Sequence, residues 1–189
     1  MYKSHNASEA KARLCQIIKE KSYREGNFTL ASGKQSKFYL DLKETTLNQE
    51  GIILCGMMMA ELMERENFKP FAVGGMTLGA DPLATALCMA AEQKNIKVQS
   101  YIVRKQPKDH GTLAWVEGAK TFPKNAGLVI LEDVVTTGGS SLKAAEKLIE
   151  AGFKIDAVIT VMDRLEGARE AIEARGFKFF SLCTLADLS

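Results

Sequence analysis

The sequence predicts an α/β protein in which helices flank a central, mostly parallel sheet. From Phe71 onward, short apolar runs alternate with segments of helical period, a pattern typical of parallel strands joined by helices. Charged or glycine-rich residues follow four of these runs, so they are expected at the carboxyl ends of the strands, where such sheets bind ligands. The expected strands cover 71–73, 98–103, 128–131, 155–162 and 177–183, and the expected helices cover 80–93, 141–151 and 167–175.

The composition is that of an ordinary globular enzyme. The chain has 189 residues, 46% hydrophobic and 25% charged, which suits one domain with a real core. Its net charge of +2 is too small to indicate a nucleic-acid surface. The four cysteines form no C-x-x-C motif, so neither a metal site nor a disulfide framework is expected. Residues 3–21 are too polar for a signal peptide, and the methionine-rich run 54–63 is too short to span a bilayer. We therefore expect a cytoplasmic protein that binds no membrane.

The N-terminal third is expected to form a helix, a hairpin and a second helix. Asn6 and Glu9 have the spacing of a capping box, and an apolar stripe of helical period follows them. Two runs with alternating apolar residues lie on either side of a turn signal, which is typical of a hairpin. The first helix is expected over 8–22, the hairpin strands over 27–30 and 38–42, and the second helix from Asn48 or Gln49 to Glu66.

Residues 128–141 carry the strongest functional pattern. An apolar strand is followed by Glu132 and Asp133, a loop of threonines and glycines over 136–139, and then a helix that Ser140 or Ser141 is expected to cap. A glycine-rich loop at a helix N-terminus suits a phosphate, whereas carboxylates suit sugar hydroxyls or a hydrated Mg²⁺. The stretch therefore predicts a site for a ribose 5-phosphate group, although an ordinary turn with exposed acids would have the same loop. Neither a P-loop nor a dinucleotide-binding motif is present.

This stretch resembles the signature of the type I phosphoribosyltransferases. The resemblance implies their fold, a mostly parallel sheet flanked by helices with a small N-terminal hood. In that family the paired acids hold the ribose hydroxyls of phosphoribosyl pyrophosphate and the loop holds its 5-phosphate. The residues implied here are Glu132, Asp133, Val134, Val135, Thr136, Thr137, Gly138, Gly139 and Ser140.

The segment 28–41 is similar to the hood of the orotate phosphoribosyltransferases, which covers the base. Some members carry a substrate-binding lysine where this chain has Ala31. Lys34 or Lys37 could take that role, or neither, since surface lysines are commonly only solvated. The resemblance implies a single domain over 1–189, with about 1–45 contributing the hood and about 70–185 the parallel-sheet core.

The glycine-rich loop 74–79 follows the first core strand. It can present backbone N–H groups to an anion, although a tight turn ahead of Asp81 and Pro82 explains its composition equally well. The family's equivalent loop contacts pyrophosphate. The resemblance therefore implies that role for Gly74, Gly75, Met76 and Thr77.

The segment 104–118 is polar, basic and without a clear period, and long loops of this kind are commonly functional. It resembles the catalytic loop of orotate phosphoribosyltransferases, which closes over the active site of the neighbouring subunit in a homodimer. The resemblance implies contacts of Arg104, Lys105, Lys108 and His110 with phosphoribosyl pyrophosphate, and catalysis by Lys108, Asp109 and His110 through charge stabilisation and proton handling. The apolar Leu113, Ala114 and Trp115 are unusual, and Trp115 is expected to pack on the hood or the partner subunit. A plain solvated loop is the alternative.

Arg164 follows the fourth core strand and resembles the arginine with which this family binds the orotate carboxylate. Its planar fork suits a carboxylate, and the resemblance implies an orotate site of Arg164 and Thr136. The alternative is a salt bridge with Glu166 or Asp163 at a helix start.

The function that these motifs imply together is that of an orotate phosphoribosyltransferase. Such an enzyme joins orotate to phosphoribosyl pyrophosphate, giving orotidine 5′-monophosphate and pyrophosphate in pyrimidine biosynthesis. The implied cofactor is Mg²⁺, held mainly through substrate and water, with no direct protein ligand expected. Two alternatives are a phosphoribosyltransferase for another base, such as a purine, and a non-catalytic regulator that binds nucleic acid. The near-neutral charge and the lack of spare length argue against the regulator.

Overall fold

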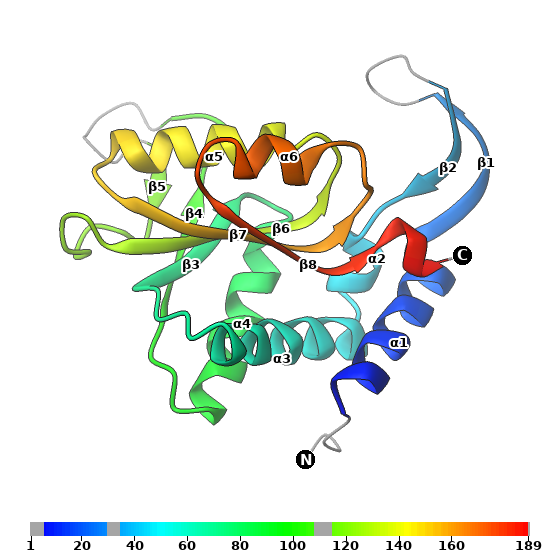
Figure 1. Cartoon of the computed structure of the whole chain (residues 1–189), viewed down its shortest axis with the longest axis horizontal. Helices are drawn as coiled ribbons and strands as arrows, with labels where there is room; N and C mark the ends of the chain where they lie inside the picture. The colour runs from blue at the N-terminus through cyan, green and yellow to red at the C-terminus, as the bar shows by residue number, and fades with distance from the viewer. Residues whose placement is uncertain (1–5, 30–34, 108–114, 189) are drawn as a thin grey trace.

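The computed structural model describes residues 6–29, 35–107 and 115–188 (Figure 1). Within them the chain forms a two-stranded sheet, β1-β2, and a six-stranded sheet of order β5-β4-β3-β6-β7-β8. The elements in chain order are α1 (Ala7–Ile17), the π-helical turn η1 (Ile18–Ser22), β1 (Tyr23–Thr29), β2 (Gln35–Leu40), α2 (Lys43–Thr46), α3 (Gln49–Arg65), β3 (Ala72–Met76), α4 (Ala80–Gln93), β4 (Gln99–Val103), β5 (Val116–Glu117), β6 (Gly127–Val135), α5 (Gly139–Glu150), β7 (Lys154–Asp163), α6 (Ala168–Glu173), β8 (Lys178–Thr184) and the 3₁₀ turn η2 (Leu185–Leu188).

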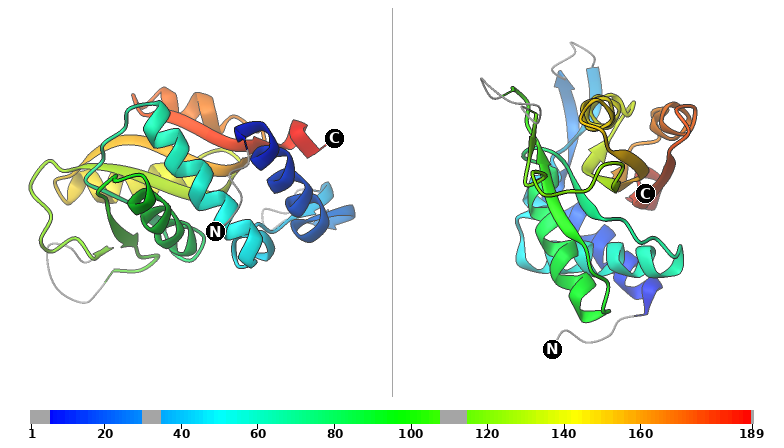
Figure 2. Two further views of the ribbon diagram at one scale, coloured as in Figure 1. Left: turned by 90° about the horizontal axis from the view of Figure 1, so that it is seen from below. Right: turned by 90° about the vertical axis from the view of Figure 1, so that its left-hand side faces the viewer.

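The six-stranded sheet confirms the predicted fold class. Its strands are parallel except β5, which pairs antiparallel with β4. Helices α3 and α4 cover one face, and α5 and α6 cover the other (Figures 1 and 2). Each face has its own cluster of buried apolar side chains, one shared with α1, α3 and α4 and one shared with α5 and α6. The strands are therefore buried on both faces, which explains why they were recognisable as continuous apolar runs.

The strand order creates a switch point between β3 and β6. The chain passes from β3 through α4 to β4 on one side, and then returns to place β6 on the other side of β3. Connections that leave neighbouring strands in opposite directions open a crevice beyond their carboxyl ends, and ligands bind there. The predicted acids lie at the carboxyl end of β6, and the predicted pyrophosphate residues lie at the carboxyl end of β3, so the two meet at this crevice.

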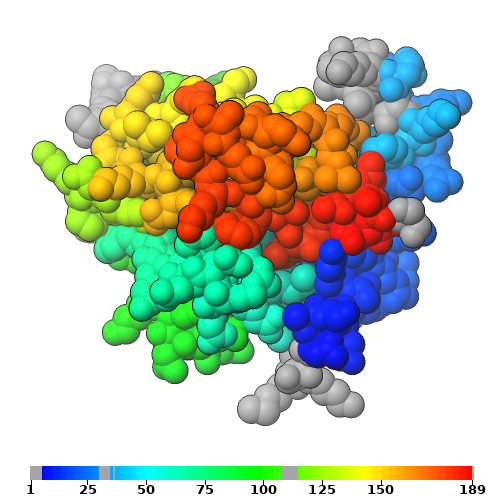
Figure 3. All heavy atoms as spheres, in the orientation of Figure 1, coloured from blue at the N-terminus to red at the C-terminus, as the bar shows by residue number. Residues whose placement is uncertain are grey.

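The N-terminal segment forms the predicted helix and hairpin. Asn6 caps α1 in a capping box with Glu9, as predicted, with 2.9 Å between the Asn6 side chain and the Glu9 N–H that donates to it. Strands β1 and β2 form an antiparallel hairpin, called the hood hairpin below, which stands out from one corner of the molecule (Figure 3). A buried hydrogen bond of 2.7 Å between the Ser22 and Thr45 hydroxyls fixes its base.

The structure also corrects several boundaries. Strand β6 runs to Val135, so both acids lie within the strand, and β3 continues through Gly74 and Gly75 into Met76. Those glycines lie so close to neighbouring backbone that a Cβ on either would collide with the carbonyl oxygen of an adjacent strand. Packing between strands, which has no local sequence signal, therefore extends β3 into the predicted loop. Helix α2 and strand β5 were not predicted because each is too short to show a period.

Candidate active site

Two segments meet at the switch point through Asp133 and Gly79. A Cβ built on Gly79 would lie 2.7 Å from Asp133 Oδ1 and 3.0 Å from Oδ2, so the carboxylate lies directly against the glycine backbone. Glu132, the other acid of the pair, is only 8% exposed. The absence of a side chain at Gly79 thus allows an acid from β6 to reach the loop that follows β3.

The electrostatics of the acid pair favour partial protonation. Burial, together with the charge of Asp133, raises the pKa of Glu132 to about 8. Burial also raises the pKa of Asp133, and the charge of Lys43 on α2 opposes that rise. Because buried negative charge is costly, hydroxyl donors or a cation beside these carboxylates would lower both pKa values. The pair is therefore suited to a ligand that supplies such groups.

The loop between β6 and α5 leaves a helix N-terminus without a capping side chain. The helix begins at Gly139 and its N-cap is Gly138, so the expectation that Ser140 or Ser141 caps it was wrong. Gly138 has a φ of +79°, a left-handed conformation that favours glycine, and a Cβ there would lie 3.2 Å from Ile172 Cγ1. The first backbone N–H groups of α5 have no intrahelical partner and no side-chain cap, which is the arrangement that binds phosphate.

The predicted loop residues line the approach to this helix. Val135 is buried, Val134 and Thr136 are half-buried, and Thr137, Gly139 and Ser140 are exposed. This mixture is what a loop that wraps a surface-accessible anion requires. The predicted order of strand, loop and helix is confirmed, but β6 extends to Val135 and α5 begins at Gly139, so the loop itself is shorter than predicted.

The segment after β3 is held by hydrogen bonds at Thr77. Its backbone N–H donates to the Val103 carbonyl at 2.9 Å, and its hydroxyl donates to Asp81 Oδ2 at 2.7 Å. The other Asp81 oxygen, Oδ1, is buried and has no hydrogen-bond partner among the described residues. The Thr77–Leu78 peptide bond is cis. Gly74, Gly75 and Met76 lie in β3 itself, so Thr77 is the first of the four predicted residues beyond the strand.

Arg164 lies at the end of β7, beside β6, and contacts both predicted and unpredicted partners. Its Nη2 forms a 2.8 Å ion pair with Glu166, which is the salt bridge weighed as an alternative to ligand binding. Its guanidinium also lies 4.7 Å from the ring centroid of Phe38 on the hood hairpin. The side chain is 10% exposed, and its Nε is buried without a hydrogen-bond partner within the described parts of the chain. Arg164 therefore retains donor capacity beneath an aromatic ring.

Phe38 is a residue of the candidate site that the sequence did not single out. The hood segment was expected to cover a base, but no aromatic residue was singled out. Its position in an alternating strand, next to Tyr39, was the available signal. The contact with Arg164 could not be predicted because the two residues are distant in sequence.

The stem of the 104–118 segment is held by contacts of Arg104 and Trp115. The Arg104 N–H donates to the Trp115 carbonyl at 2.8 Å, and Arg104 Nη1 pairs with Glu117 at 2.8 Å. Lys105 is exposed. Trp115 lies under the ammonium of Lys147 on α5, with Nζ 3.5 Å from the ring centroid, rather than on the hood hairpin. Lys37 is exposed on β2, whereas Ala31, Lys34, Lys108, Asp109, His110, Leu113 and Ala114 lie outside the described residues.

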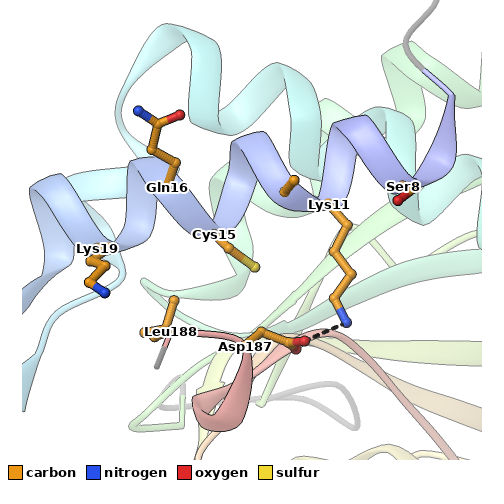
Figure 4. Close-up of a pocket in the computed structure, with 8 residues that line it drawn as sticks. Ser8, Lys11, Cys15, Gln16, Lys19, Asp187 and Leu188 are labelled. Carbon is orange, nitrogen blue, oxygen red and sulfur yellow. Dashed lines mark ion pairs between the residues drawn. The ribbon is translucent and has the colours of Figure 1, made fainter.

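A separate pocket of about 460 Å³ lies between α1 and the C-terminal η2 turn (Figure 4). Lys11 and Asp187 form a 2.9 Å ion pair across it, and Cys15 points into the same space. None of the predicted site residues lines this pocket. It is therefore distinct from the crevice at the switch point.

Two features are absent from the described residues. Among residues 6–29, 35–107 and 115–188, no group of three or more His, Cys, Asp or Glu side chains could hold a metal ion. In the same residues, no helix is long and apolar enough to cross a membrane.

The fold and the crevice at its switch point place the chain among the type I phosphoribosyltransferases. No protein-family model matches the chain. Two relatives named orotate phosphoribosyltransferase align along nearly its whole length. That of Nostoc sp. is 38% identical over 183 residues, 97% of this chain and 87% of the relative, and that of Rhodopseudomonas palustris is 44% identical over 177 residues, 93% and 94% respectively. The chain therefore belongs to the orotate phosphoribosyltransferase family.

The same family appears among solved structures. The crystal structure of Mycobacterium tuberculosis orotate phosphoribosyltransferase in complex with Fe(III) dicitrate is 37% identical, with a TM-score of 0.84 over 95% of this chain and 99% of that one. The same enzyme in complex with phosphoribosyl pyrophosphate is 35% identical, with a TM-score of 0.78 over 95% and 98%. The backbone arrangement is thus one that accommodates this sugar phosphate in a relative.

Proposed function

We propose that the chain transfers the ribose 5-phosphate group of phosphoribosyl pyrophosphate to orotate. The products are orotidine 5′-monophosphate, an intermediate in UMP biosynthesis, and pyrophosphate. The observation that carries the proposal is the contact between Asp133 and Gly79. It brings a carboxylate suited to ribose hydroxyls against a loop suited to pyrophosphate, at the crevice where a parallel sheet binds ligands. As a member of its family, the chain is a pentosyltransferase.

Each part of phosphoribosyl pyrophosphate has a matching group in the site. The 5-phosphate binds the loop 136–140 and the uncapped N-terminus of α5, where backbone N–H groups and the helix dipole favour an anion. Glu132 and Asp133 bind the ribose hydroxyls. The pyrophosphate lies between the segment after β3, at Thr77, and the cationic stem at Arg104 and Lys105.

Orotate binds beside the ribose, between the hood hairpin and the end of β7. Arg164 receives its carboxylate, the Phe38 ring packs on the pyrimidine, and Thr136 contributes a hydroxyl. The unpartnered Nε of Arg164 supports this assignment, because a buried donor without a partner is costly until a ligand satisfies it. The ion pair with Glu166 leaves the remaining guanidinium donors for the ligand.

The carboxylates of the crevice fit a hydrated Mg²⁺. Asp133, Glu132 and the unpartnered Asp81 Oδ1 are hard oxygen donors that accept hydrogen bonds from the water shell of such a cation. When bound through substrate and water, Mg²⁺ would neutralise charge on the pyrophosphate. The residues of the chain orient that water shell.

Catalysis rests on stabilising charge as the bond between ribose C1 and pyrophosphate breaks. Positive charge develops on the ribose and negative charge on the leaving group, which Arg104, Lys105 and Lys108 stabilise. A well-placed donor contributes about 10²–10³ in rate, or about 2.7–4 kcal/mol. Orotate is already an anion, so the nucleophile needs no strong base. Lys108, Asp109 and His110 are therefore assigned to charge stabilisation and proton handling at pyrophosphate.

The enzyme works as a cytoplasmic homodimer in which the 104–118 segment serves the neighbouring subunit's site. Support comes from large apolar side chains exposed at the start of α4 and along it. Leu78 is 66% exposed and Met89 is 69% exposed, and both belong to the β3–α4 unit. Exposed apolar groups of this size are common at subunit interfaces.

One assay tests the proposed reaction. The absorbance of orotate is followed after the enzyme is mixed with phosphoribosyl pyrophosphate and Mg²⁺, and orotate should be consumed with release of pyrophosphate. Adenine, guanine, hypoxanthine and uracil are offered in parallel. Consumption of a purine in place of orotate would favour the alternative substrate class, and no consumption of any base would refute a catalytic role.

A further inference from the structure

Helix α5 contacts the site at two places. Its N-terminus begins at the phosphate loop, and further along Lys147 reaches the stem of the 104–118 segment. The Lys147 ammonium lies 3.5 Å from the centroid of the Trp115 ring, and it donates to the Arg104 carbonyl at 3.4 Å. Trp115 and Arg104 are themselves joined by a 2.8 Å backbone hydrogen bond. Three residues from separate parts of the chain thus form one cluster.

These contacts surround Arg104. Its N–H is held by Trp115, its carbonyl by Lys147, and its guanidinium by Glu117 at 2.8 Å and by the Gln106 carbonyl at 3.1 Å. Such a backbone cannot rotate without breaking several contacts at once. The direction of the Arg104 side chain is therefore set by its neighbours before any ligand arrives, which lowers the entropy lost on binding.

Lys147 is the member of the cluster that ties it to α5. Among aromatic rings, the indole of tryptophan attracts a cation over its face most strongly. Lys147 is partly buried, and burial together with the charge of Lys143 lowers the pKa of its amine. The indole face and the Arg104 carbonyl are the groups that compensate its burial. Removal of the ammonium would free the Trp115 ring and one side of the Arg104 backbone.

We propose that Lys147 is a positioning residue that orients Arg104 toward the pyrophosphate of the substrate. The inference rests on the proposed function, in which Arg104 binds that group. Lys147 touches no substrate in this scheme. Because α5 also presents its N-terminus to the 5-phosphate, one rigid helix fixes the two anion sites relative to each other. The separation of those sites is then matched to a sugar that carries phosphate groups at both ends.

The test uses ligands that divide the substrate into parts. Lys147→Met keeps the length of the side chain but removes its charge. The affinity for phosphoribosyl pyrophosphate and for pyrophosphate should fall about two- to fivefold, the range expected for a partly exposed cation–π contact. The affinity for ribose 5-phosphate, which does not reach Arg104, should not change. Calorimetric titration of the full-length protein measures all three.

Two variants and one spectroscopic signal serve as controls. Lys147→Arg restores a cation over the ring and should recover most of the affinity, whereas Lys143→Met removes an exposed lysine one turn away and should change nothing. Trp115 is the chain's single tryptophan, so its fluorescence reports this cluster alone. Its emission should change in Lys147→Met and remain as in the wild type in Lys143→Met.

The outcomes separate the inference from the function on which it rests. If the wild type binds none of the three ligands, the proposed function fails. If the wild type binds them and Lys147→Met binds pyrophosphate equally well, Lys147 does not position Arg104. If Lys147→Met lowers the affinity for all three ligands equally, its role is general stability and the inference is overturned. Unchanged tryptophan emission in Lys147→Met would also overturn it, because Lys147 would then not hold the Trp115 ring.

Discussion

The carboxylate of Asp133 lies against the backbone of Gly79, where a Cβ would come within 2.7 Å of Oδ1. Gly79 has a φ of −59° and a ψ of −38°, a helical conformation that any residue adopts. The glycine is therefore required by the approach of Asp133, and not by the backbone. A substitution here tests the position of one functional carboxylate without altering its chemistry.

Gly79→Ala should displace the Asp133 carboxylate from the crevice. A charged hydrogen bond contributes about 1.5–3 kcal/mol, so the affinity for phosphoribosyl pyrophosphate should fall about 10- to 150-fold. Calorimetric titration measures the affinity and thermal unfolding checks the fold. In an Asp133→Ala background, the same Gly79→Ala change should have little further effect, because the group it displaces is gone. Equal losses in both backgrounds would show that Gly79 acts independently of Asp133.

Glu132 should make the stability of the ligand-free protein depend on pH. Burial raises its pKa to about 8, whereas the unfolded chain releases this proton near pH 4.5. Between these values the folded state binds more protons, so the free energy of unfolding should fall as pH rises through the window. The free energy of unfolding of Glu132→Gln should equal that of the wild type at pH 5. At pH 8 it should be about 2–4 kcal/mol higher than that of the wild type. Urea unfolding at several pH values measures this difference, and a constant difference would contradict the assignment.

Much of the local structure around the candidate site was predictable because its signals are local. The acids, the threonine–glycine loop and the following helix occupy one continuous stretch. The alternation of apolar runs and helical segments alone placed four charged or glycine-rich segments at the ends of strands. What the sequence could not predict involves contacts between distant residues. Asp133 with Gly79, Arg164 with Phe38 and Lys147 with Trp115 depend on how helices and strands pack. The start of α5 was misplaced because Gly138, in a left-handed conformation, occupies the N-cap position that the serines were expected to occupy.

Cys15 and Cys183 should form a disulfide when the purified protein is oxidised. Their sulfur atoms lie 3.1 Å apart, and the hydrogen bond between them lowers the pKa of Cys15. The Cys15 thiolate would attack a peroxide oxygen, forming a sulfenic acid as the peroxide is reduced. The Cys183 thiol would then displace water to form the S–S bond.

The product would join α1 to β8 and close a long loop, so the unfolding midpoint should rise by about 5–15 °C. Intact mass should show the loss of two hydrogen atoms, and reductant should reverse both changes. Cys183→Ser under the same peroxide should gain oxygen at Cys15 without the rise in unfolding midpoint. Four freely alkylated cysteines in the treated wild type would contradict the prediction.

Hybrid dimers should show whether the 104–118 segment acts on the neighbouring subunit. Lys108→Ala and Asp133→Asn are each expected to be inactive, because one lacks the loop cation and the other the ribose acceptor. If the loop acts in trans, a mixed dimer contains one site with both residues intact. Compared with wild-type enzyme at the same concentration, a random mixture should then regain about a quarter of the rate, and the purified mixed dimer about half. Two different affinity tags isolate the mixed dimer. Absence of recovery in that purified species would place the loop in its own subunit's site.

Arg164 tests the choice of orotate over other bases. Its side chain is 10% exposed, and its guanidinium pairs with Glu166 at 2.8 Å and lies 4.7 Å from the Phe38 ring centroid. Arg164→Ala removes the counter-charge from an anion pocket, so the affinity for orotate should fall about 10- to 150-fold, while that for phosphoribosyl pyrophosphate should change little. Arg164→Lys should recover only part of the loss, because an ammonium lacks the planar fork. Titration of each ligand into each variant measures these effects.

Glu166→Gln separates the two roles of this arginine. If Glu166 merely competes with orotate for the Arg164 guanidinium, removal of its charge frees an N–H donor. The affinity for orotate should then stay the same or rise. If Arg164 exists chiefly to pair with Glu166 and stabilise the turn before α6, then Glu166→Gln and Arg164→Ala should lower the unfolding midpoint alike and leave orotate binding equal to that of the wild type. Equal weakening of orotate and phosphoribosyl pyrophosphate by Arg164→Ala would instead assign Arg164 to the support of the phosphate site. An arginine that binds the orotate carboxylate requires one result only. Arg164→Ala must lose affinity for orotate selectively, and Glu166→Gln must bind orotate normally.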